Sequence, residues 1–379
     1  MQSFDGIKLA EVDVPSCGWT TLVTFECKQR DQITVNVGCK LLENEHLRVI
    51  FNNKGEITSM FDKDTGFELA AGVCNSMKMY KDVPRSYDAW DIDSMYELAP
   101  LPLDENAEIS VSKMGTLVSS LEIKRKINNS TLVQNISLRR DSRRLDFETM
   151  IDWRESHKLI KVCFPVNIHT DEALHEIQFG YVKRPNHRSR EYDADRFEVC
   201  NHKWSALVEE NRGAAIINDC KYGVNVLGNS INLTLLKAPK APDFNADVGI
   251  QKFTYSFYAW NGPLIQSNVI REAYELNIPA KCVAGSGGIN SLFRTNDANI
   301  IIDTVKPAED GSGDVIVRLF ESIHTSSRCT LSIALPIKKA VQTNMLEIPE
   351  SDLSVDNGDI YLDFRPFEIK TLRLYLSGK

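Results

Sequence analysis

The chain has 379 residues, of which 42% are hydrophobic and 25% charged, a composition typical of globular proteins with ample apolar material for a core. This length suggests two or three domains. The net charge of −8 is spread along the chain without basic blocks, which argues against nucleic acid and anionic membrane surfaces as partners.

The first strongly periodic segment predicts a β-hairpin. Apolar residues alternate over residues 47–51 and again over 57–61, and the turn-forming residues 52–55 separate the two runs. We expect a leading β segment, residues 1–39, to precede it.

The next segment, YDAWDID at 87–93, combines three carboxylates with two aromatic side chains. An aromatic ring can cover the C–H face of a pyranose, and carboxylates accept hydrogen bonds from its hydroxyls. In a strand, Asp91 and Asp93 would share one face, and Asp88 and Trp90 the other. The segment is thus a candidate sugar site or, alternatively, an ordinary strand with a buried Trp90 and surface aspartates.

A longer alternating pattern follows over residues 145–153, and it returns over 160–166 after a polar turn at 154–157. We interpret these runs as two long paired strands. Further strand-like runs occur at 216–226, 231–236, 253–260, 315–320, 330–335 and 369–376, whereas the one helix signal covers 269–276.

Many short strands with few helices predict an all-β fold of stacked antiparallel sheets. The sequence VAGSGG at 283–288 resembles a linker or a long surface loop. We therefore expect a large β domain at 40–283 and a C-terminal β-sandwich at 284–379.

The cysteines and histidines point away from structural disulfides and from zinc. Nine cysteines form an odd, widely scattered set, and seven histidines show no HxH or HExxH spacing. No apolar run has the length of a membrane span, and the N-terminus lacks the features of a signal peptide. These patterns predict reduced thiols, a cytoplasmic location and no metal site in this chain.

Several segments together, in order along nearly the whole chain, resemble glycoside hydrolase family 38, the zinc-dependent retaining α-mannosidases, and in particular its cytosolic and bacterial branch. The segments are LENEHLRVIFNNKGEITSMFDKDTG (42–66), DVPRSYDAWDID (82–93), SLRRDSRRLDFETMIDWRESHKLIKVCFPV (137–166), IQFGYVKRPNHR (177–188), DRFEVCNHKW (195–204), INDCKYG (217–223), LLKAPKAPD (235–243), FTYSFY (253–258) and PFEIKTLRL (366–374). The sequence departs from the family at Gln251, where a histidine is expected, and at Ala259–Trp260, where a proline and a histidine are expected.

The resemblance implies a galactose-mutarotase-like supersandwich flanked by smaller β elements. It also implies that the nucleophilic aspartate and the zinc ligands lie in an N-terminal α/β domain and a helical bundle that this sequence does not contain. We therefore expect no catalytic residue and no cofactor in this chain, and zinc in the full-length enzyme.

The site residues implied by the resemblance are substrate-binding ones. The first group is Tyr87, Asp88, Trp90 and Asp91, and the further candidates are Asp219, Lys221, Tyr222 and Lys237. Each could instead be a turn or sheet-edge residue, a role that we favour for Lys237.

Taken together, these features describe the carbohydrate-contacting C-terminal region of an α-mannosidase, cut from its catalytic domain and inactive alone. Its partners would be its own N-terminal catalytic domain and a mannose-containing oligosaccharide. The sequence leaves open whether the protein forms a homo-oligomer. The alternatives are a free-standing carbohydrate-binding module, a structural module, or a mutarotase-like enzyme with His175 or His202 and a glutamate as its acid and base.

Overall fold

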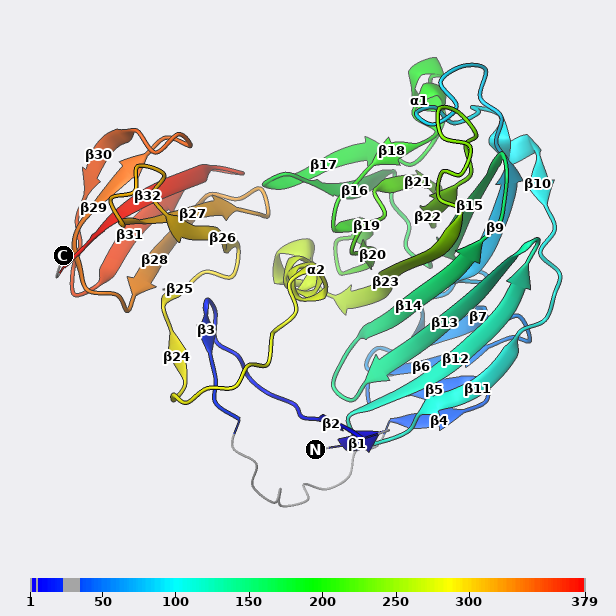
Figure 1. Ribbon diagram of the computed structural model, residues 1–379, viewed down its shortest axis with the longest axis horizontal. Helices are drawn as coiled ribbons and strands as arrows, with labels where there is room; N and C mark the ends of the chain where they lie inside the picture. The colour runs from blue at the N-terminus through cyan, green and yellow to red at the C-terminus, as the bar shows by residue number, and fades with distance from the viewer. Residues whose placement is uncertain (1, 5, 23–34, 378–379) are drawn as a thin grey trace. The chain divides into compact units, whose positions relative to one another are not determined.

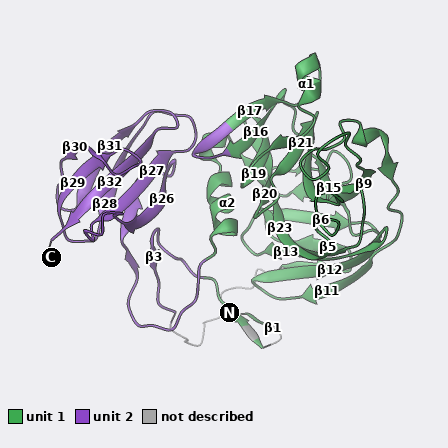
Figure 2. Cartoon of the chain, turned by 45° about the horizontal axis from the view of Figure 1, so that its top comes forward, with its two compact units in different colours: residues 1–11, 27–176, 182–279 green, residues 12–26, 177–181, 280–379 purple. Residues whose placement is uncertain are grey.

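The computed structural model describes residues 2–4, 6–22 and 35–377, so Cys27 and part of the expected leading segment lie outside the described residues. The chain divides into two compact units, shown in green and purple in Figure 2. Unit 1 comprises residues 1–11, 27–176 and 182–279, and unit 2 comprises residues 12–26, 177–181 and 280–379. The expected domain boundaries at 39/40 and 283/284 stay predictions.

Unit 1 is built around two large antiparallel sheets, and this confirms the all-β prediction. One sheet has nine strands in the order β11 (Glu108–Lys113), β12 (Val118–Ile127), β13 (Ser130–Arg139), β14 (Arg144–Trp153), β23 (Gly249–Asn261), β20 (Arg212–Asn218), β19 (Trp204–Glu209), β16 (Glu172–Ile177) and β17 (Gly180–Pro185). The other has six, in the order β10 (Pro100–Leu101), β9 (Ser76–Lys81), β15 (Lys158–Pro165), β22 (Ser230–Lys237), β21 (Gly223–Leu227) and β18 (Val199–Cys200).

Smaller elements complete unit 1 (Figure 1). The expected hairpin is β6–β7 of a five-stranded sheet, β4 (Asn36–Gly38), β5 (Leu41–Glu43), β6 (Leu47–Phe51), β7 (Ile57–Asp62) and β8 (Phe67–Glu68). The remaining elements are β1 (Gln2–Phe4), β2 (Ile7–Leu9), η1 (Tyr96–Leu98), α1 (Glu191–Asp195), η2 (Leu264–Gln266) and α2 (Val269–Asn277). The expected helix at 269–276 is therefore confirmed as α2.

The predicted pairing of residues 145–153 with 160–166 is wrong. Both runs are strands, but β14 pairs with β13 and β23, whereas β15 pairs with β9 and β22. The turn at 154–157 carries the chain from one sheet to the other, so the two strands face each other instead of pairing. Between the two sheets, Phe147 of β14 contacts Phe164 of β15, with ring centroids 5.7 Å apart.

This aromatic contact lies at the centre of the core of unit 1. Phe147 stacks on Tyr255 at 5.0 Å, Phe164 stacks on Phe257 at 5.9 Å, and all four rings are fully buried. Each buried phenylalanine contributes about 1.5–3 kcal/mol of transfer free energy. Because this core fixes the sheets, it also fixes the loops at their ends.

Gly213 of β20 lies under the indole ring of Trp260, and a Cβ atom there would overlap the ring. We expect Gly213→Ala to lower the free energy of unfolding by about 1–3 kcal/mol through overpacking. Urea unfolding measures the loss. Gly38→Ala is the matched control, since a Cβ at Gly38 would meet only Leu41 Cβ at 3.8 Å. Equal stabilities of the two variants would contradict this packing.

Unit 2 is a β-sandwich with its own core. Its sheets are β25 (Phe293–Thr295), β28 (Ser327–Ile333) and β31 (Asp359–Phe364), facing β26 (Ile300–Pro307), β27 (Val315–Glu321), β32 (Ile369–Leu376), β29 (Ile337–Thr343) and β30 (Pro349–Leu353), with β3 (Gly18–Trp19) paired to β24 (Asn290–Ser291). The VAGSGG segment lies in the exposed stretch 279–289, which contains neither helix nor strand.

Candidate functional site

The segment YDAWDID is a loop and not the strand considered from the sequence. It follows β9, and it turns tightly because the backbone N–H groups of Trp90 and Asp91 both donate to the carbonyl of Tyr87, at 2.8 and 2.9 Å. Tyr87 itself has a φ of 56°, an uncommon value outside glycine. The face-by-face alternation expected of a strand is therefore wrong for these residues.

The carboxylate of Asp88 fastens this loop to its neighbour, residues 238–248. Its Oδ2 accepts hydrogen bonds from the backbone N–H groups of Lys240 at 2.6 Å and Ala241 at 3.2 Å. Its Oδ1 lies 3.6 Å from Nδ1 of His157. Figure 1 shows the two loops side by side. Asp88 thus acts inside the protein, holding the loops together.

Lys237, at the end of β22, anchors the same loop from below. Its ammonium donates to the carbonyls of Asp88, at 2.6 Å, and of Asp91. It also lies 3.3 Å from the carboxylate of Asp82, whose side chain is fully buried, while only 15% of the Lys237 side chain is exposed. Asp82 in turn accepts a 2.8 Å hydrogen bond from the backbone of Asp93. Lys237 therefore positions the loop, as a cation engaged by protein groups.

The anchored loop presents aromatic side chains to solvent. Tyr87 and Trp90 are each 75% exposed, and Phe244, on the loop held by Asp88, is 75% exposed as well. Exposed aromatic side chains on adjoining loops can offer a binding surface, and aromatic rings suit the C–H faces of sugars. We call Tyr87, Trp90 and Phe244 the aromatic rim. Sequence reasoning missed Phe244, although an aromatic residue in the polar stretch APDFNAD was a signal.

The second candidate group occupies the turn between β20 and β21. Asp219 accepts a hydrogen bond from the backbone of Thr254 at 3.0 Å, and the ammonium of Lys221 lies 4.5 Å from the centroid of the Phe253 ring. Tyr222 is half-exposed and packs against His202. Among the described residues, no hydrogen bond joins this group to the 82–93 loop.

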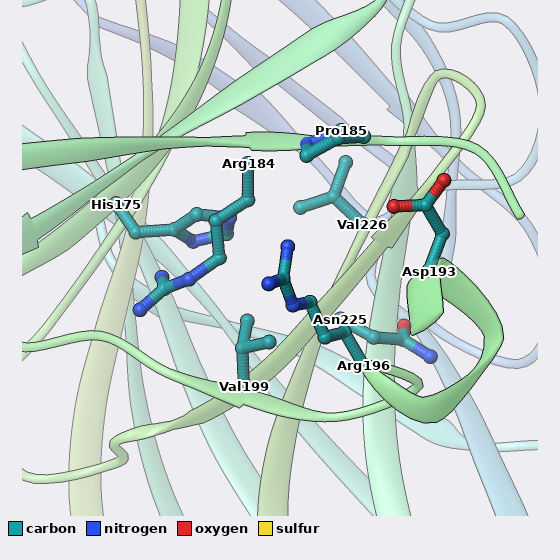
Figure 3. Close-up of a pocket in the computed structure, with 8 residues that line it drawn as sticks. All are labelled: His175, Arg184, Pro185, Asp193, Arg196, Val199, Asn225 and Val226. Atoms are coloured by element: carbon teal, nitrogen blue, oxygen red, sulfur yellow. The ribbon is translucent and has the colours of Figure 1, made fainter. Parts of the chain in front are cut away.

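For the mutarotase-like alternative, the glutamate next to His175 along the chain is Glu176, and these two residues do not form an acid–base couple. The two residues point to opposite faces of β16, because side chains alternate along a strand. Nδ1 of His175 lies 2.9 Å from the Ser205 hydroxyl, whereas Glu176 accepts hydrogen bonds from Lys203. Figure 3 shows the imidazole beside Arg184. The cavity that these two residues help to line offers about 20 Å³ to the centre of a water molecule. This space is suited to a water and not to a sugar.

Burial, assisted by the charge of Arg184, lowers the pKa of His175 to about 3 from an ordinary value of 6.5. In the unfolded chain His175 becomes protonated below about pH 6.5, whereas in the folded chain it stays neutral down to about pH 3. Between these two pH values, a fall in pH therefore lowers the free energy of unfolding. From about pH 6 to 4, we expect the wild type to lose about 1.4 kcal/mol per pH unit more than His175→Gln.

Urea unfolding at several pH values measures these slopes. His169→Gln is the matched control because His169 is exposed, and it should keep the wild-type slope. Equal slopes for wild type and His175→Gln would show that His175 protonates equally in the folded and unfolded chain.

No group of three or more His, Cys, Asp or Glu side chains within the described ranges is arranged to hold a metal ion. The eight cysteines that the structure describes are all free thiols. Across the same residues, no helix has the length and apolar character needed to cross a membrane.

Family models match both units of the chain. The glycosyl hydrolases family 38 C-terminal domain matches residues 42–245, and the family 38 C-terminal beta sandwich domain matches residues 299–372. The first match alone covers more than half of the chain.

Curated relatives match along nearly the whole chain. Human alpha-mannosidase 2C1 is 34% identical over 97% of this chain, and alpha-mannosidase G of Dictyostelium discoideum is 33% identical over 98%. Alpha-mannosidase of Saccharomyces cerevisiae is 30% identical over 99%. The chain spans only 37%, 37% and 39% of these three proteins.

A solved structure has the same fold. The alpha-mannosidase from Enterococcus faecalis V583 superposes on 93% of this chain with a TM-score of 0.75 at 19% identity, and the match covers 44% of that protein.

Proposed function

The chain belongs to glycosyl hydrolase family 38, as the matches to both C-terminal models show, and we propose that it is the carbohydrate-contacting C-terminal region of an α-mannosidase. The whole enzyme would remove α-linked mannose from oligosaccharides. The observation that carries the sugar-contacting role is the aromatic rim, held in place by the Lys237 and Asp88 anchors. The same family membership supports the proposal of a retaining mechanism.

In this proposal, the chain's residues bind sugar and do not react with it. Retaining hydrolysis requires two carboxyl groups about 5 Å apart across the scissile bond. The three carboxylates of the YDAWDID segment accept hydrogen bonds from backbone N–H groups instead. Asp88 accepts from Lys240, Asp91 Oδ1 from Ile92 at 2.9 Å, and Asp93 Oδ1 from Met95 at 3.0 Å. The nucleophile and the acid would therefore come from the N-terminal catalytic domain.

The rings of the aromatic rim would cover the apolar face of a mannose unit and exclude water from it. A loop whose backbone is already fixed loses less conformational entropy on binding, which is the advantage of anchoring it at Lys237 and Asp88. Asp219, Lys221 and Tyr222 stay candidates for contacts further from this loop.

Zinc, in this proposal, belongs to the catalytic domain, where it would act as a Lewis acid. The described residues of this chain offer it no ligand group. We also propose a cytoplasmic location, which the free thiols support because reducing compartments preserve them.

The experiment that tests the proposal is hydrolysis of an aryl α-mannoside, with and without added zinc, by this chain and by the protein extended upstream to the length of its relatives. We expect turnover by the extended protein alone. Turnover by this chain would overturn the proposal, and Asp88, Asp91 and Asp93 would then be the first residues to replace.

A further inference from the structure

A second recess lies on the face of the six-stranded sheet that is turned away from the core of unit 1. Strand register places Lys161 opposite Thr234, and Cys163 opposite Asn232, which is opposite Asn225. Directly opposed residues share a face, so these side chains project together from β15, β22 and β21. The intervening residues of the strands, such as Val162 and Leu233, belong to the buried core.

The recess has the size of one sugar ring. It offers about 250 Å³ to the centre of a water molecule, below the volumes of roughly 300–1,000 Å³ that hold drug-sized ligands. Two tyrosines flank it, and the rings of Tyr80 and Tyr96 meet edge to face at 5.0 Å. Tyr96 and Glu97 of η1 close one side, and Leu227 of β21 gives an apolar wall.

The two charged residues that line the recess are both neutralised. The ammonium of Lys161 lies 2.6 Å from each carboxylate oxygen of Glu198. The carboxylate of Glu97 is held by two parallel hydrogen bonds of 2.8 Å from Arg188. A site without net charge has no electrostatic preference for an ion, so its polar groups suit a neutral ligand.

The uncharged polar groups of the recess are held in fixed orientations. Asn232 donates to Asn225 at 2.8 Å, Asn225 donates to the Tyr96 hydroxyl at 3.1 Å, and Ser230 donates to Asn232 at 2.8 Å. Each oxygen that accepts one of these bonds has a second lone pair. The phenol of Tyr80 is a hydrogen-bond donor at neutral pH, and burial, which raises its pKa to about 12, keeps it so in mildly alkaline solution as well.

We propose that this recess is a second carbohydrate site, which binds one neutral pyranose through Tyr80, Ser230, Asn232 and Glu97. Sugar hydroxyls both donate and accept, and they match a fixed set of amide, carboxylate and phenol groups. The site does not depend on the aromatic rim or on catalysis. It would hold a glycan unit on this chain whether or not the catalytic domain is present.

The test is an NMR titration of the isotopically labelled chain with methyl α-mannopyranoside, and with glucuronate as an anionic comparison. We expect amide shifts along β15, β21 and β22 with the mannoside and weaker binding of glucuronate. Asn232→Ala should weaken binding about tenfold through the loss of one hydrogen bond, and Ser230→Phe should abolish it by filling the recess.

One variant serves as the control. Thr58→Phe places the same phenylalanine on an exposed position of β7, and it should bind the mannoside as the parent chain does. Shifts confined to residues 85–93, unchanged affinity in a folded Ser230→Phe variant, equal binding of glucuronate, or no shift up to the solubility of the mannoside would each overturn the proposal. Even if both recess variants fail to fold, the positions of the amide shifts in the unmodified chain show whether the mannoside binds in the recess.

Discussion

Replacing Trp90 by alanine is expected to lower kcat/KM of the full-length enzyme for an α-mannoside by roughly 30-fold, which corresponds to about 2 kcal/mol. The physical reason is the loss of a large, pre-positioned ring from the surface that we assign to the sugar. Because the Trp90 side chain is 75% exposed, its removal should change the free energy of unfolding by less than about 0.5 kcal/mol. Steady-state kinetics and urea unfolding of the same preparations separate the two effects.

The matched control is Tyr361→Ala, which removes a ring that is 67% exposed from β31 of unit 2 and should leave kcat/KM unchanged. If a folded Trp90→Ala enzyme had wild-type kinetics, Trp90 would not contribute to the sugar site. Loss of activity in both variants would show that the effect is not specific to the aromatic rim.

Lys237→Met is expected to lower the free energy of unfolding of this chain by about 3–5 kcal/mol, because it leaves the Asp82 carboxylate buried without its cation. The variant also removes the hydrogen bonds to the carbonyls of Asp88 and Asp91, so the 82–93 loop should become more mobile. Urea unfolding measures the first effect, and amide hydrogen exchange of the loop measures the second.

Adding Asp82→Asn to Lys237→Met should recover much of the lost stability, since it removes the unpaired charge while keeping an oxygen for the backbone of Asp93. Lys240→Met is the control, because the Lys240 ammonium makes only a surface bond to the Phe244 carbonyl. A loss no larger than that of the control would contradict the anchoring role of Lys237.

Much of the fold could be predicted from alternation alone, but the pairing of strands could not. Residues 145–153 and 158–165 both alternate because every second side chain of each strand faces the core, and this pattern is the same whichever strand lies alongside. β14 pairs with β23, about 110 residues further along the chain, through the register Phe147 opposite Tyr255. The short turn suggested a hairpin, whereas it leads from one sheet to the other.

The composition of the candidate site could be read from the sequence, but the conformation of its loop could not. The aromatic and acidic content of residues 87–93 pointed to a sugar surface, yet a period of two could not show that the segment turns at Tyr87. The roles of Asp88 and Lys237 depend on contacts between residues 149 positions apart, which no local pattern records. The recess at Asn232 could not be predicted from the sequence for the same reason, because the strands that line it, β9, β15, β22 and β21, come together only in the folded sheet.

The measurement that tests the sugar-contacting role most directly is a structure of the full-length protein with a mannose-configured inhibitor. We predict a ring of the aromatic rim, Trp90 or Tyr87, in van der Waals contact with the inhibitor at about 4 Å, and Lys237 still bonded to the loop backbone. An inhibitor bound in a cleft that no residue of 82–93 or 238–248 lines would contradict the role that we assign to this chain.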